Sequence, residues 1–360
     1  MNRSRLLVAV FFTAGLALES CKKETEIQIR ETQVDKKYSW SEVPSLYGLN
    51  RVILSTGNDG QSIYLQQPNF FTRFINQNPR RGLMTSIGPP SDVNMRLPIG
   101  AQIFAYPLTD TTLVICRNKE PLNSQAYVEL RRFDPTAIRF NTRVFTLSKC
   151  MAINKNNYLL APYDNRRSDR PLTFLLAAVT PGTLGGPPVT ASTRQVVIPR
   201  NVSSGAYVRN LEAIDDYFLV NLGDAGIYKI KQDGSYRQVH GPAIADAFYK
   251  WNNTVYAPVE YNEMLISTTD GDTWQRASGT PTHFTLANYY SVRDSLVGVY
   301  QNAIYTLRWN RPRFTSRFLK NDGLERATIT GVEYLHDTVY VATTSGLFAR
   351  PVKEFFLTKE

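Results

Sequence analysis

The chain of 360 residues contains little cysteine, histidine and methionine, with only three Cys, three His and five Met. His240, His283 and His336 stand far apart, without the spacing of a zinc or iron site. The sequence also lacks a long stretch of apolar residues at helical spacing, a glycine-rich phosphate loop and a serine nucleophile elbow. We therefore expect no metal, no cofactor and no predominantly helical fold.

Charged residues are few, at 20%, but they are unbalanced: 41 Lys and Arg against 31 Asp and Glu give a net charge of +10. A basic surface of this kind attracts anionic partners. The positive residues are scattered, and the densest run is Arg166, Arg167 and Arg170, with Asp164 and Asp169 interleaved. Dispersed charge of both signs is typical of a solvated surface, so we predict no nucleic-acid partner.

The only long apolar run lies at the N-terminus. Arg3 and Arg5 precede thirteen apolar or small residues, 6–18, and Cys21 follows shortly after. A membrane-spanning anchor is the alternative interpretation, but it needs about 20 apolar residues. The positive start, short apolar region and small closing residues are typical of a secretory signal.

The end of this segment, Leu18-Glu19-Ser20-Cys21, resembles the lipobox of bacterial lipoproteins. Leu18 and Ser20 suit the pattern, whereas Glu19 occupies a slot that usually holds a small or apolar residue. The resemblance implies that residues 1–20 are a lipoprotein signal peptide and that Cys21 becomes a lipid-carrying N-terminus. It also implies export and lipid anchoring in a bacterial cell envelope, at its periplasmic face or at the cell surface.

Residues 21–45 are polar and charged, which predicts a lipidated flexible tether ahead of a domain spanning residues 46–360. Two cysteines remain in that domain, Cys116 and Cys150, and each lies in an apolar run. An exported protein experiences oxidising conditions, so a Cys116–Cys150 disulfide and two buried thiols are both open interpretations.

The composition of the domain favours strands and turns, because the chain has 20 Tyr, 18 Phe, 20 Pro and 21 Gly. A turn residue followed by strand-forming residues recurs seven times, at intervals of 37 to 60 residues. These turns are at Asn50, Asp110, Asn156, Asp216, Asn253, Asp294 and Asp337.

Further short strands follow or precede several of these turns, which suggests four strands per repeat of about 40 residues. The sequence therefore predicts an all-β fold, a β-propeller of about seven four-stranded blades. The longest intervals require inserted loops, which we expect at residues 78–92 and 180–194, where Pro and Gly gather. A β-sandwich or a solenoid is the alternative.

One turn points to a family. Residues 267–274, Ser-Thr-Thr-Asp-Gly-Asp-Thr-Trp, resemble the Asp-box, or BNR repeat, of sialidase-type propellers. Ser267, Gly271, Thr273 and Trp274 match in place, whereas Thr269 fills the acidic slot and the acid follows at Asp270. The resemblance implies a structural turn between the third and fourth strands of a blade, remote from any active site.

Evidence for catalysis is weaker. Arg96 lies in Met-Arg-Leu-Pro, which faintly resembles the motif that supplies one of the three substrate-binding arginines of sialidases. Further arginines are abundant (Arg209, Arg276, Arg293 and Arg308), and the acid pairs Asp215 with Asp216 and Glu260 with Glu263 lie in predicted turns. Solvated turn acids are the simpler interpretation of these pairs.

Three Asp-Ser/Thr turns resemble the acceptor of a general O-glycosylation system of some Gram-negative bacteria, with Thr111, Ser295 and Thr338 as the acceptor residues. Asp-Thr before a strand is also ordinary hairpin chemistry, so both interpretations stay open.

The sequence thus predicts an envelope-anchored lipoprotein that presents a non-enzymatic binding or scaffold module for glycan or protein. The residues we expect to contact that partner are Tyr163, Arg166, Arg167 and Arg170, in a predicted loop. The alternatives are a sialidase-like carbohydrate-active enzyme and an assembly factor for a membrane complex.

Overall fold

The computed structural model divides the chain into two compact units, Met1–Tyr38 and Ser39–Glu360. It describes only residues of the second unit: 39–43, 51–58, 60–67, 70–75, 102–117, 125–140, 151–167, 169, 171–183, 188–199, 207–260, 262–278, 287–310, 313–324 and 326–358. Cys21, Arg96, Cys150 and Arg170 lie outside these residues. Among the described helices, none is long and apolar enough to cross a membrane.

The described strands form seven antiparallel sheets, numbered here in chain order. Sheet 1 contains β2 (Ser55–Asn58), β3 (Ser62–Gln67) and β4 (Phe70–Ile75). Sheet 2 contains β5 (Ile103–Pro107), β6 (Thr112–Arg117) and β7 (Gln125–Glu129), and a short helix α2 (Leu130–Phe133) follows it. Sheet 3 contains β8 (Ala137–Phe140), β9 (Ala152–Ile153), β10 (Tyr158–Asn165), β11 (Leu172–Thr180) and β12 (Thr190–Ile198).

The remaining four sheets each have four strands. Sheet 4 contains β13 (Asn210–Ile214), β14 (Tyr217–Asn221), β15 (Ile227–Lys231) and β16 (Tyr236–His240), with the 3-10 turn η2 (Gly223–Ala225) between β14 and β15. Sheet 5 contains β17 (Tyr249–Trp251), β18 (Thr254–Val259), β19 (Glu263–Ser267) and β20 (Gln275–Ala277). Sheet 6 contains β21 (Asn288–Val292), β22 (Ser295–Tyr300), β23 (Ala303–Asn310) and β24 (Arg313–Phe318). Sheet 7 contains β25 (Ile329–Leu335), β26 (Thr338–Thr343), β27 (Gly346–Pro351) and β1 (Ser41–Glu42), and α4 (Val352–Phe355) follows β27.

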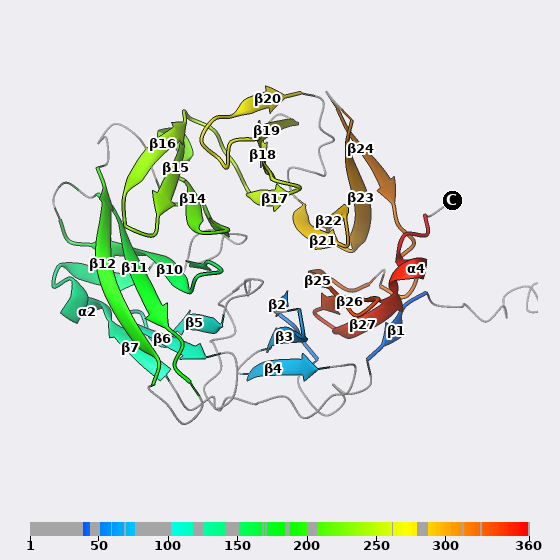
Figure 1. Cartoon of the computed structure of the whole chain (residues 1–360), viewed down its shortest axis with the longest axis horizontal. Helices are drawn as coiled ribbons and strands as arrows, with labels where there is room; N and C mark the ends of the chain where they lie inside the picture. The colour runs from blue at the N-terminus through cyan, green and yellow to red at the C-terminus, as the bar shows by residue number, and fades with distance from the viewer. Residues whose placement is uncertain are drawn as a thin grey trace, which may run out of the picture. The chain divides into compact units, whose positions relative to one another are not determined.

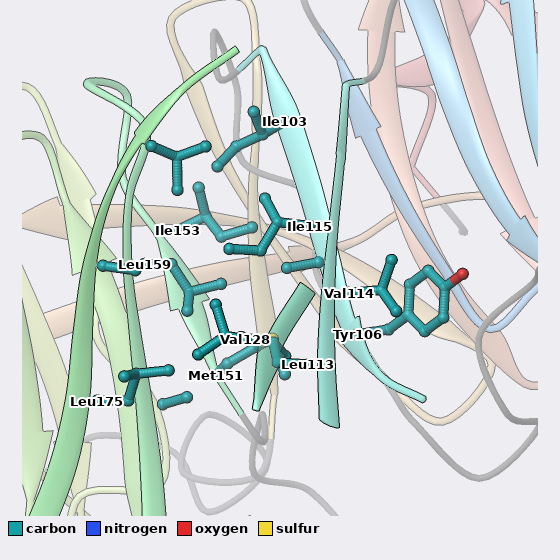
Figure 2. Close-up of a cluster of buried hydrophobic side chains, with 14 of the residues drawn as sticks. Ile103, Tyr106, Leu113, Val114, Ile115, Val128, Met151, Ile153, Leu159 and Leu175 are labelled. Carbon is teal, nitrogen blue, oxygen red and sulfur yellow. The ribbon is translucent and has the colours of Figure 1, made fainter. Parts of the chain in front are cut away.

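The seven sheets of this unit form a ring, because each one shares an apolar core with the next (Figure 1). Figure 2 shows one such core, in which Leu113, Ile115 and Val128 of sheet 2 face Leu159 and Leu175 of sheet 3. No single sheet covers its own apolar faces, and packing in a ring buries them on both sides. The predicted β-propeller is therefore confirmed.

The ring closes through the two ends of the unit. β1 pairs antiparallel with β27, with Ser41 opposite Ala349 and Glu42 opposite Phe348. Trp40 is 5% exposed, and its ring meets Phe355 edge-on at 6.0 Å between centroids. This finding corrects the predicted end of the tether at residue 45, because Ser41 and Glu42 form a strand of sheet 7 and Trp40 is buried in the core shared by sheets 6 and 7.

Six of the seven predicted turns precede a strand as expected, namely β6, β10, β14, β18, β22 and β26. Their Asn and Asp residues suit hairpins that need positive φ, as at Asn252 (46°) and Asn253 (58°). The repeat predicted from Asn50 is misplaced, since the strand β2 begins at Ser55 rather than at Val52. The first hairpin turns instead near Asn58, whose side-chain oxygen accepts a hydrogen bond from Gly60 N at 2.7 Å.

The loop predicted at residues 180–194 is shorter than expected. β12 begins at Thr190 and pairs with β11 along its whole length, from Thr180↔Thr190 to Leu172↔Ile198. The loop predicted at 78–92 lies outside the described residues.

Candidate binding site

The turn at residues 267–274 joins the third and fourth strands of sheet 5, as its sequence predicts. Ser267 Oγ accepts hydrogen bonds from Gly271 N at 2.9 Å and Thr269 N at 3.3 Å. Thr269 Oγ1 accepts one from Thr273 N at 2.9 Å. Thr269, which occupies the position of the acid in the family pattern, thus stabilises the turn through its hydroxyl. Gly271 supplies the positive φ of 79° that the turn needs.

The same turn fastens sheet 5 to sheet 4. Lys229 Nζ, from β15, lies 2.7 Å from Asp272 Oδ1 and 2.8 Å from the backbone oxygen of Asp270. The same ammonium stands 4.0 Å from the centre of the Tyr217 ring. Trp274 packs against the core shared by sheets 4 and 5. These contacts give the motif a structural role between blades.

Neighbouring turns are linked in the same way along this face. Lys250 Nζ lies 2.5 Å from Asp215 Oδ2 and 2.6 Å from Asp270 Oδ1, and Lys155 reaches Asp215 at 3.5 Å. Burial alone would raise the pKa of Asp215, but the hydrogen bond and charge of Lys250 lower it overall. The candidate acid Asp215 is thus held by two lysines. Asp216 is exposed in the β13–β14 turn.

The other candidate acids and arginines do not converge on one point. Arg276 pairs with Glu263 at 2.9 Å, Arg209 pairs with Asp246 at 2.9 Å, and Arg293 pairs with Asp337. Glu260 is half-buried in the turn between β18 and β19. Each of these three arginines therefore pairs with a different carboxylate, and the three side chains do not meet at one site.

Tyr163 is not a loop residue. It lies within β10 and is 3% exposed. Its hydroxyl donates to Asp134 Oδ2 at 2.8 Å, and Gln195 Nε2 donates to the same oxygen at 3.0 Å. Burial raises the pKa of Tyr163 well above its ordinary 10.0, so the phenol stays protonated. The predicted contact role is wrong, because the side chain faces the core shared by sheets 2 and 3.

The arginines beyond β10 are exposed, as predicted. Arg167 makes two bonds to Asp169, from Nε at 3.1 Å and from Nη2 at 2.8 Å. The backbone N–H of Arg166 donates to Thr136 O at 2.9 Å, and its side chain bonds to no residue that the structure describes. Because Thr136 follows α2 closely, this bond brings the helix to the end of β10.

The helix adds two arginines that sequence reasoning missed. Arg131 and Arg132 are exposed on α2, and Asp134 ends that helix. We call Arg131, Arg132, Arg166 and Arg167 the arginine corner. Arg131, Arg132 and Arg166 have no ion pair with any described carboxylate. The Arg-Arg pair was visible in the sequence, but only the fold places it beside residues more than thirty positions away.

A groove of about 920 Å³ lies over sheet 6. Arg308 and Arg317 line it together with Trp251, Trp309 and Phe356. It was not predicted, because it combines sheet 5, sheet 6 and the segment after α4. Arg308, a candidate sialidase arginine, lies here on β23 rather than with the other candidate arginines.

The other predicted residues lie beside turns or in the core. Thr111, Ser295 and Thr338 are half-buried beside hairpin turns. Cys116 is a buried thiol in β6, and burial raises its pKa to about 12. No cluster of His, Cys, Asp and Glu within the described residues is arranged to hold a metal ion.

The chain matches no family model and no curated protein. Its fold is similar to that of a catalytically inactive virginiamycin B lyase from Staphylococcus aureus solved with quinupristin, at 12% identity and a TM-score of 0.53, covering 87% of this chain and 98% of that one. BamB from Moraxella catarrhalis has 12% identity and a TM-score of 0.47, with 83% and 85% covered. YCF48 with a bound peptide has 10% identity and a TM-score of 0.48, with 91% and 99% covered. Identities this low show a shared fold, which does not carry a function with it.

Proposed function

We propose that this chain is an envelope-anchored bacterial lipoprotein, whose Asp-box propeller is a non-enzymatic binding module for glycan or protein. The observation that carries the proposal is the arginine corner. Three exposed arginines without a described carboxylate partner lie on α2 and at the end of β10, two segments that the bond from Arg166 N to Thr136 O joins. Unpaired arginines present planar donor forks to carboxylate, sulfate or phosphate groups of a partner.

The groups beneath the corner favour binding over catalysis. A nucleophilic or acid–base residue works best with a pKa near the operating pH. In Tyr163 the pKa is raised, so deprotonation is made harder. Burial alone would raise the pKa of Asp134, yet hydrogen bonds from Thr136 and Tyr163 lower it overall. An ionised Asp134 that is 8% exposed serves to position α2 and β10 beneath the arginines.

The binding proposal is tested on the full chain, purified in detergent, with a glycan array and a parallel panel of chromogenic glycosides. The triple variant R131Q/R132Q/R166Q removes the three corner arginines that have no described carboxylate partner, and R326Q removes another exposed arginine as a control. We expect binding without turnover, weakened by the triple variant and unchanged by R326Q. If the array is silent, we expect crosslinking to an envelope protein that depends on the corner. Turnover of any glycoside contradicts the proposal.

The anchoring proposal has its own test. Substituting Cys21→Ser removes the thiol that would carry lipid. We expect the native chain to incorporate labelled fatty acid and to sediment with membranes, and C21S to do neither. Equal labelling of both chains contradicts lipid attachment at Cys21.

A further inference from the structure

In the groove over sheet 6, the pairing of two strands fixes the positions of four polar side chains. β23 and β24 pair so that Thr306 lies opposite Arg317 and Arg308 lies opposite Thr315. Residues two apart on a strand share a face, so all four side chains lie on one face of this pair of strands. The two arginines are diagonal neighbours, about 7–8 Å apart by the usual strand spacing and somewhat closer at their Cβ atoms.

The face of β23 and β24 that carries the arginines is covered by apolar packing over only part of its length. Farther along the same face, Ile304 and Leu319 are buried in the core shared with sheet 7. The opposite face of the pair carries Leu307 and Phe314, which pack in the core shared with sheet 5. The arginines thus stand where the apolar packing of their own face has ended.

The C-terminal segment forms one wall of the groove. Phe356 and Thr358 line it. Lys320 N donates to Leu357 O at 2.8 Å, and Leu319 bridges Thr358, so this segment is held against the end of β24. The groove is therefore bounded by hydrogen-bonded backbone, which keeps its shape before any ligand arrives.

The charge of the groove is positive. Arg308 and Arg317 are exposed, and neither has an ion pair with a described carboxylate. Asp294 is the acid among the lining residues, at the turn that begins sheet 6's second strand. By contrast, Arg209, Arg276 and Arg293 each pair with a carboxylate. Two guanidinium groups on one face, without a described carboxylate partner, suit a negatively charged ligand.

The rest of the lining suits a sugar. On the side of the arginines, the half-buried ring of Phe356 offers apolar surface, and Ser295 offers a hydroxyl, because the register of β22 with β23 places Ser295 on the same face as Arg308. Trp251 and Trp309 line the other side, against the core shared with sheet 5. Sugar rings have an apolar C–H face and a rim of hydroxyls, so they use aromatic rings and hydroxyl groups together. A volume of about 920 Å³ is enough for an oligosaccharide of a few units.

We propose that this groove binds an acidic oligosaccharide, with Arg308 and Arg317 holding the carboxylate groups of the sugar. The proposal rests on the proposed function as a binding module, but it assigns a ligand class to a site that is separate from the arginine corner. The corner lies on α2 and sheet 3, whereas the groove lies on sheet 6 across the ring (Figure 1).

The test is calorimetric titration of the full chain in detergent with tri-galacturonate, and with maltotriose and penta-glutamate as a neutral sugar and an acidic peptide. The variants are R308Q/R317Q for the groove, R131Q/R132Q/R166Q for the corner and R326Q as an exposed control. We expect tri-galacturonate to bind, and R308Q/R317Q to weaken it by at least about tenfold, since a hydrogen bond to a charged group is worth that much. R326Q is expected to bind normally, and the corner variant shows whether any of the affinity comes from the corner instead of the groove.

Several outcomes overturn the proposal. Loss of binding in the corner variant alone removes the groove as the site but leaves the proposed function standing. Equal binding of maltotriose removes the need for charge, and groove-dependent binding of penta-glutamate alone replaces sugar by peptide. Absence of any tri-galacturonate binding to the native chain also overturns the groove's ligand class, whatever the glycan array shows at the corner.

Discussion

Lys229 Nζ lies 2.7 Å from Asp272 Oδ1, although the two residues belong to neighbouring sheets of the ring. The side chain of Lys229 is only 9% exposed, and that of Asp272 is 38% exposed. Because an ammonium this buried requires its partners, the pair couples the packing of sheet 4 to the turn of sheet 5. The contact gives the Asp-box-like turn a measurable role in stability.

We expect K229M to lower the free energy of unfolding by about 1–3 kcal/mol, because Asp272 and the Asp270 carbonyl lose a buried donor while the apolar stem is kept. Urea unfolding measures the change. K231M, an exposed lysine on the same strand, is the control and is expected to change stability by less than about 0.5 kcal/mol. Equal stability of K229M and the native chain would contradict the role of the pair.

Stability is expected to fall in acid through this same contact. Burial alone would raise the pKa of Asp272, but Lys229 and Arg237 lower it overall below its ordinary 3.8. A carboxyl with a lowered pKa in the folded state stabilises the fold above the ordinary value, and that stability is lost as the pH falls through the lower value. Thermal melts between pH 6 and pH 2 of the native chain and D272N test this. The native chain should lose more stability than D272N below about pH 4, and parallel curves would refute the coupling.

The hydroxyl of Ser267 accepts two backbone N–H groups in the turn. S267A leaves the buried Gly271 N–H without this acceptor, so we expect a loss of about 1–2 kcal/mol. Thr268 is exposed in the same turn, and T268A is the matched control. Differential scanning calorimetry measures the melting temperatures of S267A and T268A. Identical values for the two variants would show that the turn tolerates the loss of the Ser267 hydroxyl.

Ring closure predicts a role for a residue that the sequence alone assigned to a tether. Trp40 packs on Phe355, and the Arg350 guanidinium lies 5.6 Å from its ring centre. We expect W40A to cost about 3–5 kcal/mol, as for other buried aromatics. L357A removes a side chain that is 50% exposed and should be nearly neutral. A neutral W40A would mean that the domain begins after residue 40.

Tyr163 is expected to matter for stability and not for turnover. Y163F removes the hydroxyl that donates to Asp134, and we expect a loss of about 1–2 kcal/mol. Y158F, a half-buried tyrosine of the same strand, is the control. If Y163F instead abolished the hydrolysis of a glycoside while keeping native stability, Tyr163 would have a catalytic role that contradicts this account.

Most hairpins could be predicted from the sequence, because Asn and Asp at a turn are local chemistry. The first hairpin was missed for a long-range reason. Val52, Ile53 and Leu54 have strand-like composition, yet Ile53 N donates to Thr343 O of sheet 7 and Leu54 N donates to Gln66 O of sheet 1. This segment bridges two sheets, which no local pattern reveals.

The candidate binding surfaces were predicted only in part, for similar reasons. Exposed Arg166 and Arg167 followed from composition, but the burial of Tyr163 depends on which face of β10 meets sheet 2. The groove depends on the register of β23 with β24 and on the fold-back of residues 356–358. Both features depend on tertiary structure. The only sequence feature that indicates the pairing of β1 with β27 is an isolated Trp40 in a polar segment.

The central claim is that this propeller binds its partner without changing it. The most direct measurement is mass spectrometry of each oligosaccharide of the array after prolonged incubation with the full chain. The account predicts that every oligosaccharide, bound or not, is recovered with its mass unchanged. A cleaved or eliminated product that forms with the native chain and is absent without it would contradict the account.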